Sequence, residues 1–454
     1  MAQEPIALNY DSPTQRWDRF VHVVPLAFVT YSLAFLDRVN YGYAEAAGLS
    51  KSLNITANIA ALLPALFFIG YFLFQVPAAN WASKRNVKWL VFWALIAWGL
   101  LSGLTGLLKN VSLLIAVRLL LGAVEGVVLP AMLIFLTRWF TKPERSRANA
   151  LLILANPVMM IAASLISGFL ISYFNAHPVP HFQGWQMMFV LEGLPSIIWA
   201  VLWVMLAQER PVDARWLELD AAAKVQGLLD EEQRSMQHIR DYWAAFADQR
   251  VILLSLMYMS FSAAGYGLMF WLPKIIRQAT SDGIAATGVL SAVPYAIGMI
   301  AMIAVSYASD RTLKRKRFVV GSMFAGAIGY AIAYLSGAND FWLMFAGLVV
   351  VGCCIYTPCG PLWAWMGDML PRNVVGESMA LVNSAGALGG FIGTYLFGLI
   401  IAKFGNGPGF AFLACLFTLA GILGLLAQSS QRQPAGFEPI VGELKPATEQ
   451  AAAR

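Results

Sequence analysis

A succession of twelve strongly apolar runs is the feature that most constrains how this chain can fold. Each run is about as long as the roughly 20 residues that a helix needs to cross a lipid bilayer. The runs cover residues 20–44, 57–79, 88–108, 111–138, 147–173, 185–207, 251–273, 285–308, 318–337, 341–366, 375–402 and 409–427. The pattern predicts an all-α polytopic membrane protein with about twelve transmembrane helices.

The composition also indicates that lipid is the solvent for most of the chain. Hydrophobic residues make up 59% of the 454 residues and charged residues only 12%. A soluble domain carries about 25% charged residues, and a soluble chain this apolar would aggregate. A soluble globular protein is therefore excluded.

The sequence lacks the residue groupings that would hold a metal or a cofactor. The four cysteines lie inside apolar runs, at spacings that match neither a disulfide framework nor a zinc site. The four histidines lie at span ends or in loops, and no nucleotide-binding glycine loop followed by Lys-Ser or Lys-Thr is present. We expect no metal, no cofactor and no ATP-driven pump, so the driving force would be an ion gradient, here a proton gradient.

One long connector divides the runs into two groups of six. We expect a cytoplasmic N-terminus at 1–19, a six-helix bundle at 20–207, a cytoplasmic linker at 208–250, a second bundle at 251–427 and a disordered cytoplasmic tail at 428–454. The loop at Trp81 to Arg85 is echoed by the loop at Tyr307 to Arg311. Such repeats predict two pseudo-symmetric bundles, an architecture of secondary transporters.

The distribution of loop cations predicts the orientation in the membrane. One set of short loops carries Lys84, Arg85, Lys88, Arg138, Lys142, Arg145, Arg147, Arg311, Lys314, Arg315, Lys316, Arg317 and Arg372. The opposite set carries only Lys51, Lys109, Lys274, Arg277 and Lys403. Because cytoplasmic loops carry the excess of lysine and arginine, the first set and both termini are expected in the cytoplasm. The net charge of +6 then reflects orientation, not a nucleic-acid partner. The tight loops favour a bacterial inner membrane, and we expect a monomer.

Four charged residues lie inside predicted spans: Asp37 and Arg38 in the first, and Arg118 and Glu125 in the fourth. A charge at the centre of a spanning helix costs about 2.5–3.5 kcal/mol on insertion scales, so such residues face a polar cavity or a partner. Arg118 and Glu125 are seven residues apart and share one helix face, but two turns are too far for direct contact. One explanation is a structural ion-pair network that ties the helices together.

The functional alternative divides the work between the two kinds of charge. Arginine stays protonated and offers a fork that matches a carboxylate, so Arg38 and Arg118 suit an anionic substrate. Burial disfavours the charged form of a carboxyl group, and a nearby guanidinium favours it. A substrate anion on the arginine weakens that second effect, which couples proton uptake at Asp37 or Glu125 to substrate binding.

Other features of the spans suggest packing or a binding site. Span ten contains Pro358, Gly360 and Pro361, which predict a broken helix beside Trp363; Trp365 is expected in the interfacial aromatic belt. The glycines of span eleven are expected to allow close helix packing. Glu192 is expected to tether helices. The polar residues Tyr71, Gln75, Asn156 and Asn383 are candidates for contact with a substrate.

Several of these segments resemble one known family. Leu36 to Tyr41 resembles the LDRxN signature of the anion:cation symporter family within the major facilitator superfamily. Arg118 to Gly126, followed by Pro130, is similar to its RxxxGxxEG…P pattern. Gly184 to Gly193 looks like its GWRWMFxxEG segment, and Asn383 to Gly393 resembles its NxxGxxGG run. The loop after span two departs from the superfamily's usual GxxxDRxGRR pattern, because it keeps the cations but lacks the acid, which survives only as Asp310 in the second copy. The resemblance implies that these loops are gating loops, with Lys84, Arg85, Asp310 and Arg311 as the residues involved.

The resemblance implies a function and assigns roles. Members of that family take up organic anions, such as sugar acids (galactonate, rhamnonate, glucarate), tartrate or aromatic acids, usually with protons. By this match Asp37 and Glu125 would be the protonation sites, and Arg38 and Arg118 would handle the carboxylate. Residues expected to line the substrate site are Tyr41, Tyr71, Asn156, Trp363 and Asn383.

The leading hypothesis is therefore a secondary active importer of a small organic carboxylate by proton symport with alternating access. An organic-anion exchanger or a sodium-coupled carrier of the same fold remains an alternative. An integral-membrane enzyme would need converging His, Asp or Cys groups near one membrane face, and the sequence offers none. A receptor or scaffold derived from a carrier is a third class, which transport of a labelled carboxylate by purified protein would exclude.

Overall fold

The computed structural model describes residues 13–84, 86–235, 248–280, 283–336, 340–369 and 375–427. Twelve helices in these ranges are long and apolar enough to cross a membrane, and their positions confirm the twelve predicted spans. The predictions for Arg85, for the linker at 236–247 and for the C-terminal tail lie outside the described residues.

The first six spans contain α1 (Pro13–Ala46), α3 (Ala57–Lys84), α4 (Val87–Leu107), α5 (Val111–Glu125), α6 (Val128–Thr137), α7 (Lys142–Ala176) and α8 (Gly184–Leu206). The last six contain α11 (Gln249–Ala279), α12 (Ile284–Thr312), α13 (Arg315–Leu335), α14 (Phe341–Tyr356), α15 (Cys359–Met369), α16 (Val375–Phe404) and α17 (Asn406–Leu426). Shorter helices are α2 (Leu49–Ser52), the 3₁₀ turn at Pro211–Asp213 and α9 (Leu219–Ser235).

Two spans are broken at membrane depth. The tenth divides into α14 and α15 at Thr357 and Pro358, which confirms the predicted break. The fourth divides into α5 and α6 at Gly126 and Val127, where the sequence had suggested one continuous helix. A small deviation suffices there, because Val127 N–H bonds to Val124 C=O, one residue closer than in an α-helix. This turn makes Glu125 the last residue of α5.

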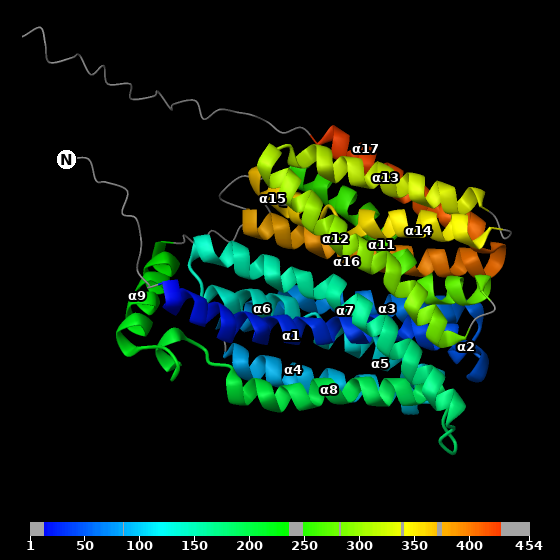
Figure 1. Cartoon of the computed structure of the whole chain (residues 1–454), viewed down its shortest axis with the longest axis horizontal. Coiled ribbons are helices and arrows are strands. Elements are labelled where there is room, and N and C mark those ends of the chain that lie inside the picture. Colours follow the sequence, from blue (N-terminus) through cyan, green and yellow to red (C-terminus); the bar gives the residue numbers. More distant parts are fainter. Residues whose placement is uncertain are drawn as a thin grey trace, which may run out of the picture.

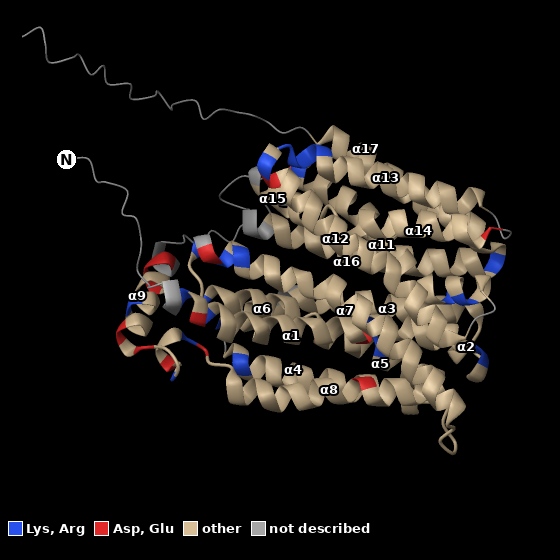
Figure 2. Cartoon of the chain, viewed as in Figure 1, with Lys and Arg blue, Asp and Glu red and all other residues tan. Residues whose placement is uncertain are grey.

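The spans form two six-helix bundles (Figure 1). Within the first, α4 packs on α8, α3 on α5 and α1 on α7; within the second, α11 packs on α16 and α13 on α17 and α14. The bundles meet where α7 packs on α12, α3 on α16 and α1 on α11. Lysine, arginine, aspartate and glutamate gather mainly at the two ends of the molecule (Figure 2). We name the end beside α9 the inner end and the end beside α2 the outer end, after the predicted orientation.

The linker is attached to the inner end of the first bundle. Glu209 forms an ion pair with Arg138 and accepts a hydrogen bond from the backbone N–H of Lys88. Farther along, Glu232 in α9 forms an ion pair with Arg145 at 2.8 Å and accepts from Lys142 N–H at 3.1 Å. These contacts use loop cations that the sequence analysis assigned to the cytoplasmic side.

The outer ends of the two bundles are in close contact. An ion pair joins Glu45 of α1 to Lys274 of α11, with 2.8 Å between Oε1 and Nζ. Nearby, a Cβ on Gly42 would lie 2.5 Å from the carbonyl oxygen of Phe270, and Gly168 of α7 faces Gly288 of α12 at similar range. The helices can approach this closely only because glycine has no side chain. The structure is therefore closed toward the outer side.

The glycines of span eleven pack as predicted. A Cβ on Gly389 would lie 2.1 Å from the carbonyl oxygen of Met259, and one on Gly393 would lie 2.0 Å from that of Ala263. Both contacts join α16 to α11, the pair of helices with the most extensive packing in the described chain. Gly390 instead faces the Phe68 ring of the first bundle.

The same logic yields a stability prediction for the helix that carries Glu125. A Cβ on Gly122 would lie 1.9 Å from the carbonyl oxygen of Phe67, so Gly122→Ala must push α5 away from α3. Overpacking of this kind costs roughly 1–3 kcal/mol, and we expect a lower thermal midpoint in detergent. Gly321→Ala is the matched control, because nothing lies within 4 Å of its Cβ position. Equal midpoints for the two variants would contradict this packing.

Candidate functional site

The four charged residues predicted inside the spans are all buried in the first bundle. Asp37 is 1% exposed, Arg38 5%, Arg118 1% and Glu125 0%. Charges withdrawn from water this completely need partners, because the desolvation penalty is several kcal/mol per ion. The arrangement of these partners decides whether the group is only structural.

Arg38 and Glu125 form a buried ion pair between α1 and α5. The Nε of Arg38 donates to Oε2 of Glu125 at 3.1 Å. Glu125 contacts only Nε of Arg38, so the two terminal nitrogens are not part of this ion pair, and the Tyr266 side chain of α11 lies within hydrogen-bonding range of the guanidinium. That edge of the guanidinium fork faces the second bundle and has the geometry to bind a carboxylate. The arginine is paired but not fully occupied.

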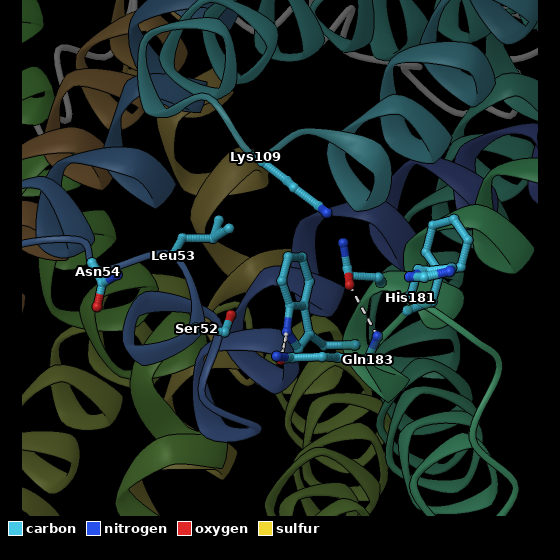
Figure 3. A pocket seen from close by; sticks show the side chains of 9 residues that line it. Ser52, Leu53, Asn54, Lys109, His181 and Gln183 are labelled. Atoms are coloured by element: carbon cyan, nitrogen blue, oxygen red, sulfur yellow. Dashed lines mark hydrogen bonds between the residues drawn. The ribbon is translucent and has the colours of Figure 1, made fainter.

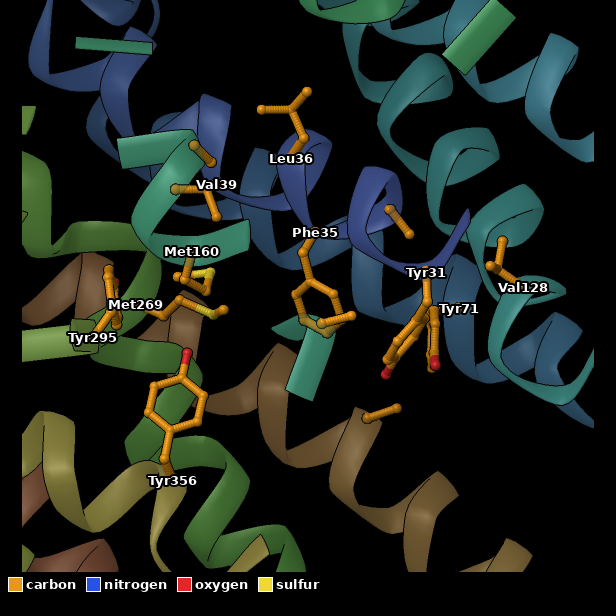
Figure 4. Packing of buried hydrophobic residues seen from close by; sticks show 14 of the residues in the cluster. Tyr31, Phe35, Leu36, Val39, Tyr71, Val128, Met160, Met269, Tyr295 and Tyr356 are labelled. Atoms are coloured by element: carbon orange, nitrogen blue, oxygen red, sulfur yellow. The ribbon is translucent and has the colours of Figure 1, made fainter. Parts of the chain in front are cut away.

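Three aromatic rings hold this guanidinium in place. The Cζ of Arg38 lies 4.7 Å from the ring centroid of Phe35, 5.1 Å from Phe67 and 4.8 Å from Tyr71. A desolvated cation–π contact stabilises by about 2 kcal/mol, so the rings keep the cation in place when no anion is bound. Figure 4 shows Tyr71 beside Tyr31, with both hydroxyl groups pointing the same way.

Asp37 is held by neutral donors. The Ser102 hydroxyl of α4 and the Asn40 amide of α1 both donate to its Oδ1, the latter at 3.1 Å. Its Oδ2 has no partner among the described residues, and no described cation forms an ion pair with it. Asp37 is thus a buried carboxyl group with one oxygen free to accept a proton.

Arg118 is buried inside the first bundle. Its guanidinium lies over the rings of Tyr41 at 4.5 Å and Phe189 at 5.3 Å. Its Nε and one terminal nitrogen are buried without a hydrogen-bond partner in the described chain, and it interacts electrostatically with Asp37 and Glu125. Direct contact of Arg118 and Tyr41 with substrate stays a prediction; in this conformation both are covered by the first bundle.

The surface opposite Arg38 is formed by tyrosines of the second bundle. Tyr266 of α11 packs on Phe68 with 4.7 Å between centroids and interacts electrostatically with Arg38. Tyr258, two turns away, packs on Trp363 at 5.4 Å. Tyr258, Tyr266 and Trp363 are partly exposed although they lie at membrane depth. Because Tyr266 faces the other bundle and not lipid, its exposure indicates space between the bundles.

Two predicted polar residues also lie at mid-depth. The Oδ1 of Asn156 in α7 accepts a hydrogen bond from the Tyr356 hydroxyl of α14 at 3.3 Å, which bridges the bundles. Asn383 of α16 is half-buried and forms no hydrogen bond with a described residue. Tyr71 lies over Arg38 and Asn156 bridges the bundles, whereas Trp363 packs on Tyr258 of its own bundle. Contact of Trp363 and Asn383 with substrate stays a prediction.

Of the remaining predictions, the structure contradicts one, and the role of the gating loops stays a prediction. Trp365 was expected in the aromatic belt, and this is wrong: it is 4% exposed, because the break before α15 turns it into the second bundle. The guanidinium of Arg311 lies 4.5 Å from the Tyr307 ring. Lys84 and Asp310 are exposed and form no ion pair among the described residues, so the gating role of these loops stays a prediction.

Sequence reasoning missed several polar groups near the site. Ser102, Tyr31, Tyr258 and Tyr266 are common residues inside apolar runs, and only tertiary packing brings them to Asp37 and Arg38. The Glu45–Lys274 pair had a weak signal, since both residues lie at span ends on the outer side.

A separate pocket of about 560 Å³ opens at the outer end of the first bundle, away from this site (Figure 3). It is lined by loop residues Ser52, Leu53, Asn54, Lys109, His181, Phe182, Gln183, Trp185 and Gln186. Gln183 and Gln186 bond to each other across the start of α8, so the polar groups of this pocket serve mainly to order the loop.

Comparison with known proteins adds independent information. A family model described as Major Facilitator Superfamily matches residues 27–394. A "Putative tartrate transporter" of Agrobacterium vitis is 32% identical over 90% of this chain and 90% of its own length. The "Quinolone resistance transporter" of Acinetobacter baumannii is 28% identical over 88% and 92%. The "Inner membrane transport protein RhmT" of Escherichia coli is 27% identical over 83% of this chain and 86% of its own.

Solved structures of transporters share the fold. A bacterial homologue of the lysosomal transporter Spinster superposes with a TM-score of 0.71 at 15% identity, covering 90% of this chain and 96% of its own. The xylose transporter XylE from E. coli gives 0.71 at 14% identity, covering 89% and 95%. At such identities the likeness concerns the fold alone. With twelve spans in two bundles and a family match over most of its length, this multi-pass membrane protein belongs to the Major Facilitator Superfamily, and its relatives fit the organic-anion carriers of that superfamily.

Proposed function

We propose that the protein imports a small organic carboxylate together with protons, with both termini in the cytoplasm of a bacterial cell. The observation that carries this proposal is the Arg38–Glu125 pair, in which Glu125 contacts Nε and leaves both terminal nitrogens of Arg38 outside the ion pair, on the side of Tyr266 of the second bundle. A purely structural pair would be expected to use the whole fork. The relatives named for tartrate and other substrates support an organic acid as the cargo.

The surroundings of Arg38 suit an anion that also carries hydroxyl groups or a ring. The free edge of the guanidinium would bind the carboxylate. Tyr71 and Tyr266, which interact with the same cation, would donate hydrogen bonds, and Asn383 would offer both donor and acceptor groups. Trp363 beside Tyr258 would cover the apolar part of the substrate. Roles for these side chains follow from their positions around one cation.

Proton coupling would follow from the position of Arg38 between two negative partners. With no substrate, the guanidinium stabilises ionised Glu125 across 3.1 Å. A substrate carboxylate on the terminal nitrogens takes over part of that positive charge, so Glu125 gains affinity for a proton. Linkage requires the reverse as well: protonation of Glu125 strengthens substrate binding. Arg118 would act on the two acids and not on the cargo, because it interacts with Asp37 and Glu125 inside the bundle.

Transport would require the bundles to rock about this site. The structure is closed at the outer end by the Glu45–Lys274 pair and the glycine contacts beside it. Outward opening must break these contacts, and the small size of the glycine faces makes the separation possible without repacking a core. A carrier of this kind needs no cofactor or metal, and we propose no enzymatic activity for it.

The direct test is uptake by purified protein in liposomes. We expect labelled tartrate to accumulate above its external concentration when the outside is acidic, and the ionophore that collapses the proton gradient to abolish accumulation. An inward sodium gradient at equal pH serves as the control. Accumulation driven by sodium would replace this proposal with the sodium-coupled alternative. If tartrate, galactonate, rhamnonate, glucarate and an aromatic acid all fail to move, the carboxylate assignment is wrong.

A further inference from the structure

Glu192 of α8 is a buried carboxyl group of the first bundle that the proposed coupling does not use. It is 2% exposed. The Ser167 hydroxyl of α7 donates to its Oε1 at 2.7 Å, while its Oε2 is buried without a partner among the described residues. A buried ionised carboxylate with one oxygen unsatisfied is costly, so the state of Glu192 needs an explanation.

The balance of buried charges in the first bundle bears on the protonation state of Glu192. At the inner end Arg19 pairs with Glu144, and at the outer end Lys274 pairs with Glu45. Between them, the buried charged side chains of the described first bundle are Arg38, Arg118, Asp37, Glu125 and Glu192. Two guanidinium groups can balance only two carboxylates. One of the three acids therefore carries a proton when no substrate is bound, unless the bundle holds an uncompensated negative charge.

The neighbours of Glu192 indicate which of the three acids carries the proton. Arg38 pairs with Glu125, and Arg118 interacts with Asp37 and Glu125, whereas Glu192 forms no ion pair with any described cation. From α1 it faces Asp37, Asn40 and Tyr43. From α7 it faces Ser167, and from α4 the adjoining Gly193 meets only the backbone of Gly99 and Gly103. From α5 the guanidinium of Arg118 lies 5.3 Å from the ring of Phe189, one turn before Glu192 on α8, but it forms no ion pair with Glu192 in the described chain.

A second buried acceptor without a partner lies on Asn40. The Oδ1 of Asn40 is buried and receives no hydrogen bond from the described residues, and the Asn40 side chain adjoins the Glu192 carboxyl group. A proton on Oε2 of Glu192 would satisfy both atoms, because Glu192 would donate to Oδ1 of Asn40. The amide of Asn40 already donates to Oδ1 of Asp37 at 3.1 Å. One proton thus turns two unsatisfied acceptors into a continuous chain from Glu192 to Asp37.

We propose that Glu192 holds a resident proton and is a positioning residue for Asp37: its carboxylic acid orients the Asn40 amide, which keeps one N–H directed at the Asp37 carboxylate. This rests on the proposed proton symport and on the sequence-based prediction that Asp37 is one of its protonation sites. Ser167 fixes which oxygen of Glu192 is the carbonyl and which carries the proton. The resident proton does not cycle, and Arg38, Arg118, Asp37 and Glu125 remain electrically balanced when empty.

Infrared spectroscopy of the purified, substrate-free protein tests the protonation directly. At neutral pH we expect a C=O stretching band of a protonated carboxyl group that Glu192→Gln removes and Ser167→Ala shifts without removing, because the Ser167 hydroxyl donates to that C=O. Asp37→Asn and Glu125→Gln should leave the band in place. If Glu192→Gln removes no such band, Glu192 is ionised and the inference is overturned. This arm does not depend on transport, so its result stands even if the proposed function fails.

Transport assays test the positioning role. Glutamine mimics a protonated glutamate, since it can accept from Ser167 and donate to Asn40, so we expect Glu192→Gln to accumulate tartrate with unchanged acid stimulation. Glu192→Leu keeps the apolar volume but lacks the donor. Without an oriented Asn40, the ionised form of Asp37 loses a hydrogen bond, and the pH profile of uptake should move to higher pH. A purely structural role would change the amount of folded protein but not the profile. Loss of accumulation in Glu192→Gln would show that the proton cycles and overturn the proposal.

Discussion

Arg38→Ala is expected to abolish carboxylate uptake. The variant should fold stably only when Glu125 is neutralised as well. The Arg38 guanidinium pairs with Glu125 through Nε alone, and Tyr266 of the second bundle lies beside it. Charge-assisted hydrogen bonds contribute about 1.5–3 kcal/mol each, so the loss of two should weaken tartrate binding by a factor of roughly 100 or more. Initial rates in liposomes and calorimetric titration with tartrate measure this.

The double variant separates the site from the fold. Arg38→Ala alone leaves Glu125 buried without its cation, a change that costs roughly 3–5 kcal/mol. Arg38→Ala with Glu125→Gln removes both charges and should restore the thermal midpoint without restoring transport. Arg38→Lys keeps the charge but loses the fork, so we expect intermediate affinity. Tartrate transport of ordinary affinity by the double variant would show that the substrate binds elsewhere.

Glu125→Gln is expected to convert an accumulating carrier into one that only equilibrates its substrate. A glutamine cannot exchange a proton, so an imposed pH gradient no longer adds to the substrate gradient, and uphill accumulation should fall to the level without a gradient. Exchange of internal for external tartrate should persist, because Arg38 is retained and its guanidinium no longer pairs with an ionised glutamate. Parallel accumulation and counterflow assays on the same liposomes measure the two activities.

Glu144→Gln is the matched control for this substitution. Glu144 is a buried glutamate of the same bundle that also pairs with an arginine, Arg19, at 3.0 Å, but it lies at the inner end. We expect it to lower stability and to leave the ratio of accumulation to exchange unchanged. If both glutamine variants lose accumulation to the same extent, the effect belongs to ion-pair loss in general and not to proton exchange at Glu125.

The fold could be predicted closely from the sequence because the bilayer imposes a length on each apolar run. The break of span ten was predicted from two prolines and a glycine that stand close together. The turn after Glu125 was not predicted, since Gly126 alone within an apolar helix is more often a packing residue. Trp365 was misplaced because its position along the span indicates its depth in the membrane but not that its side chain is buried against other helices.

The candidate site was predicted in its charges but not in its pairing. Asp37, Arg38, Arg118 and Glu125 stand out because charge is rare inside a span. Sequence spacing excluded an Arg118–Glu125 contact, which agrees with the structure, but it could not show that Arg38 is the partner of Glu125 from another helix. Serine, asparagine and tyrosine are too frequent in membrane helices to be assigned from sequence, so Ser102 and Tyr266 became visible only through packing.

Movement of protons with the substrate tests the central claim most directly. Liposomes with equal pH on both sides and a pH-sensitive dye inside would receive tartrate from outside, with the membrane potential clamped. The account predicts that wild-type protein acidifies the interior as tartrate enters and that Glu125→Gln, in the same liposomes, admits tartrate without acidification. Tartrate entry through the wild type with no change in internal pH would contradict it.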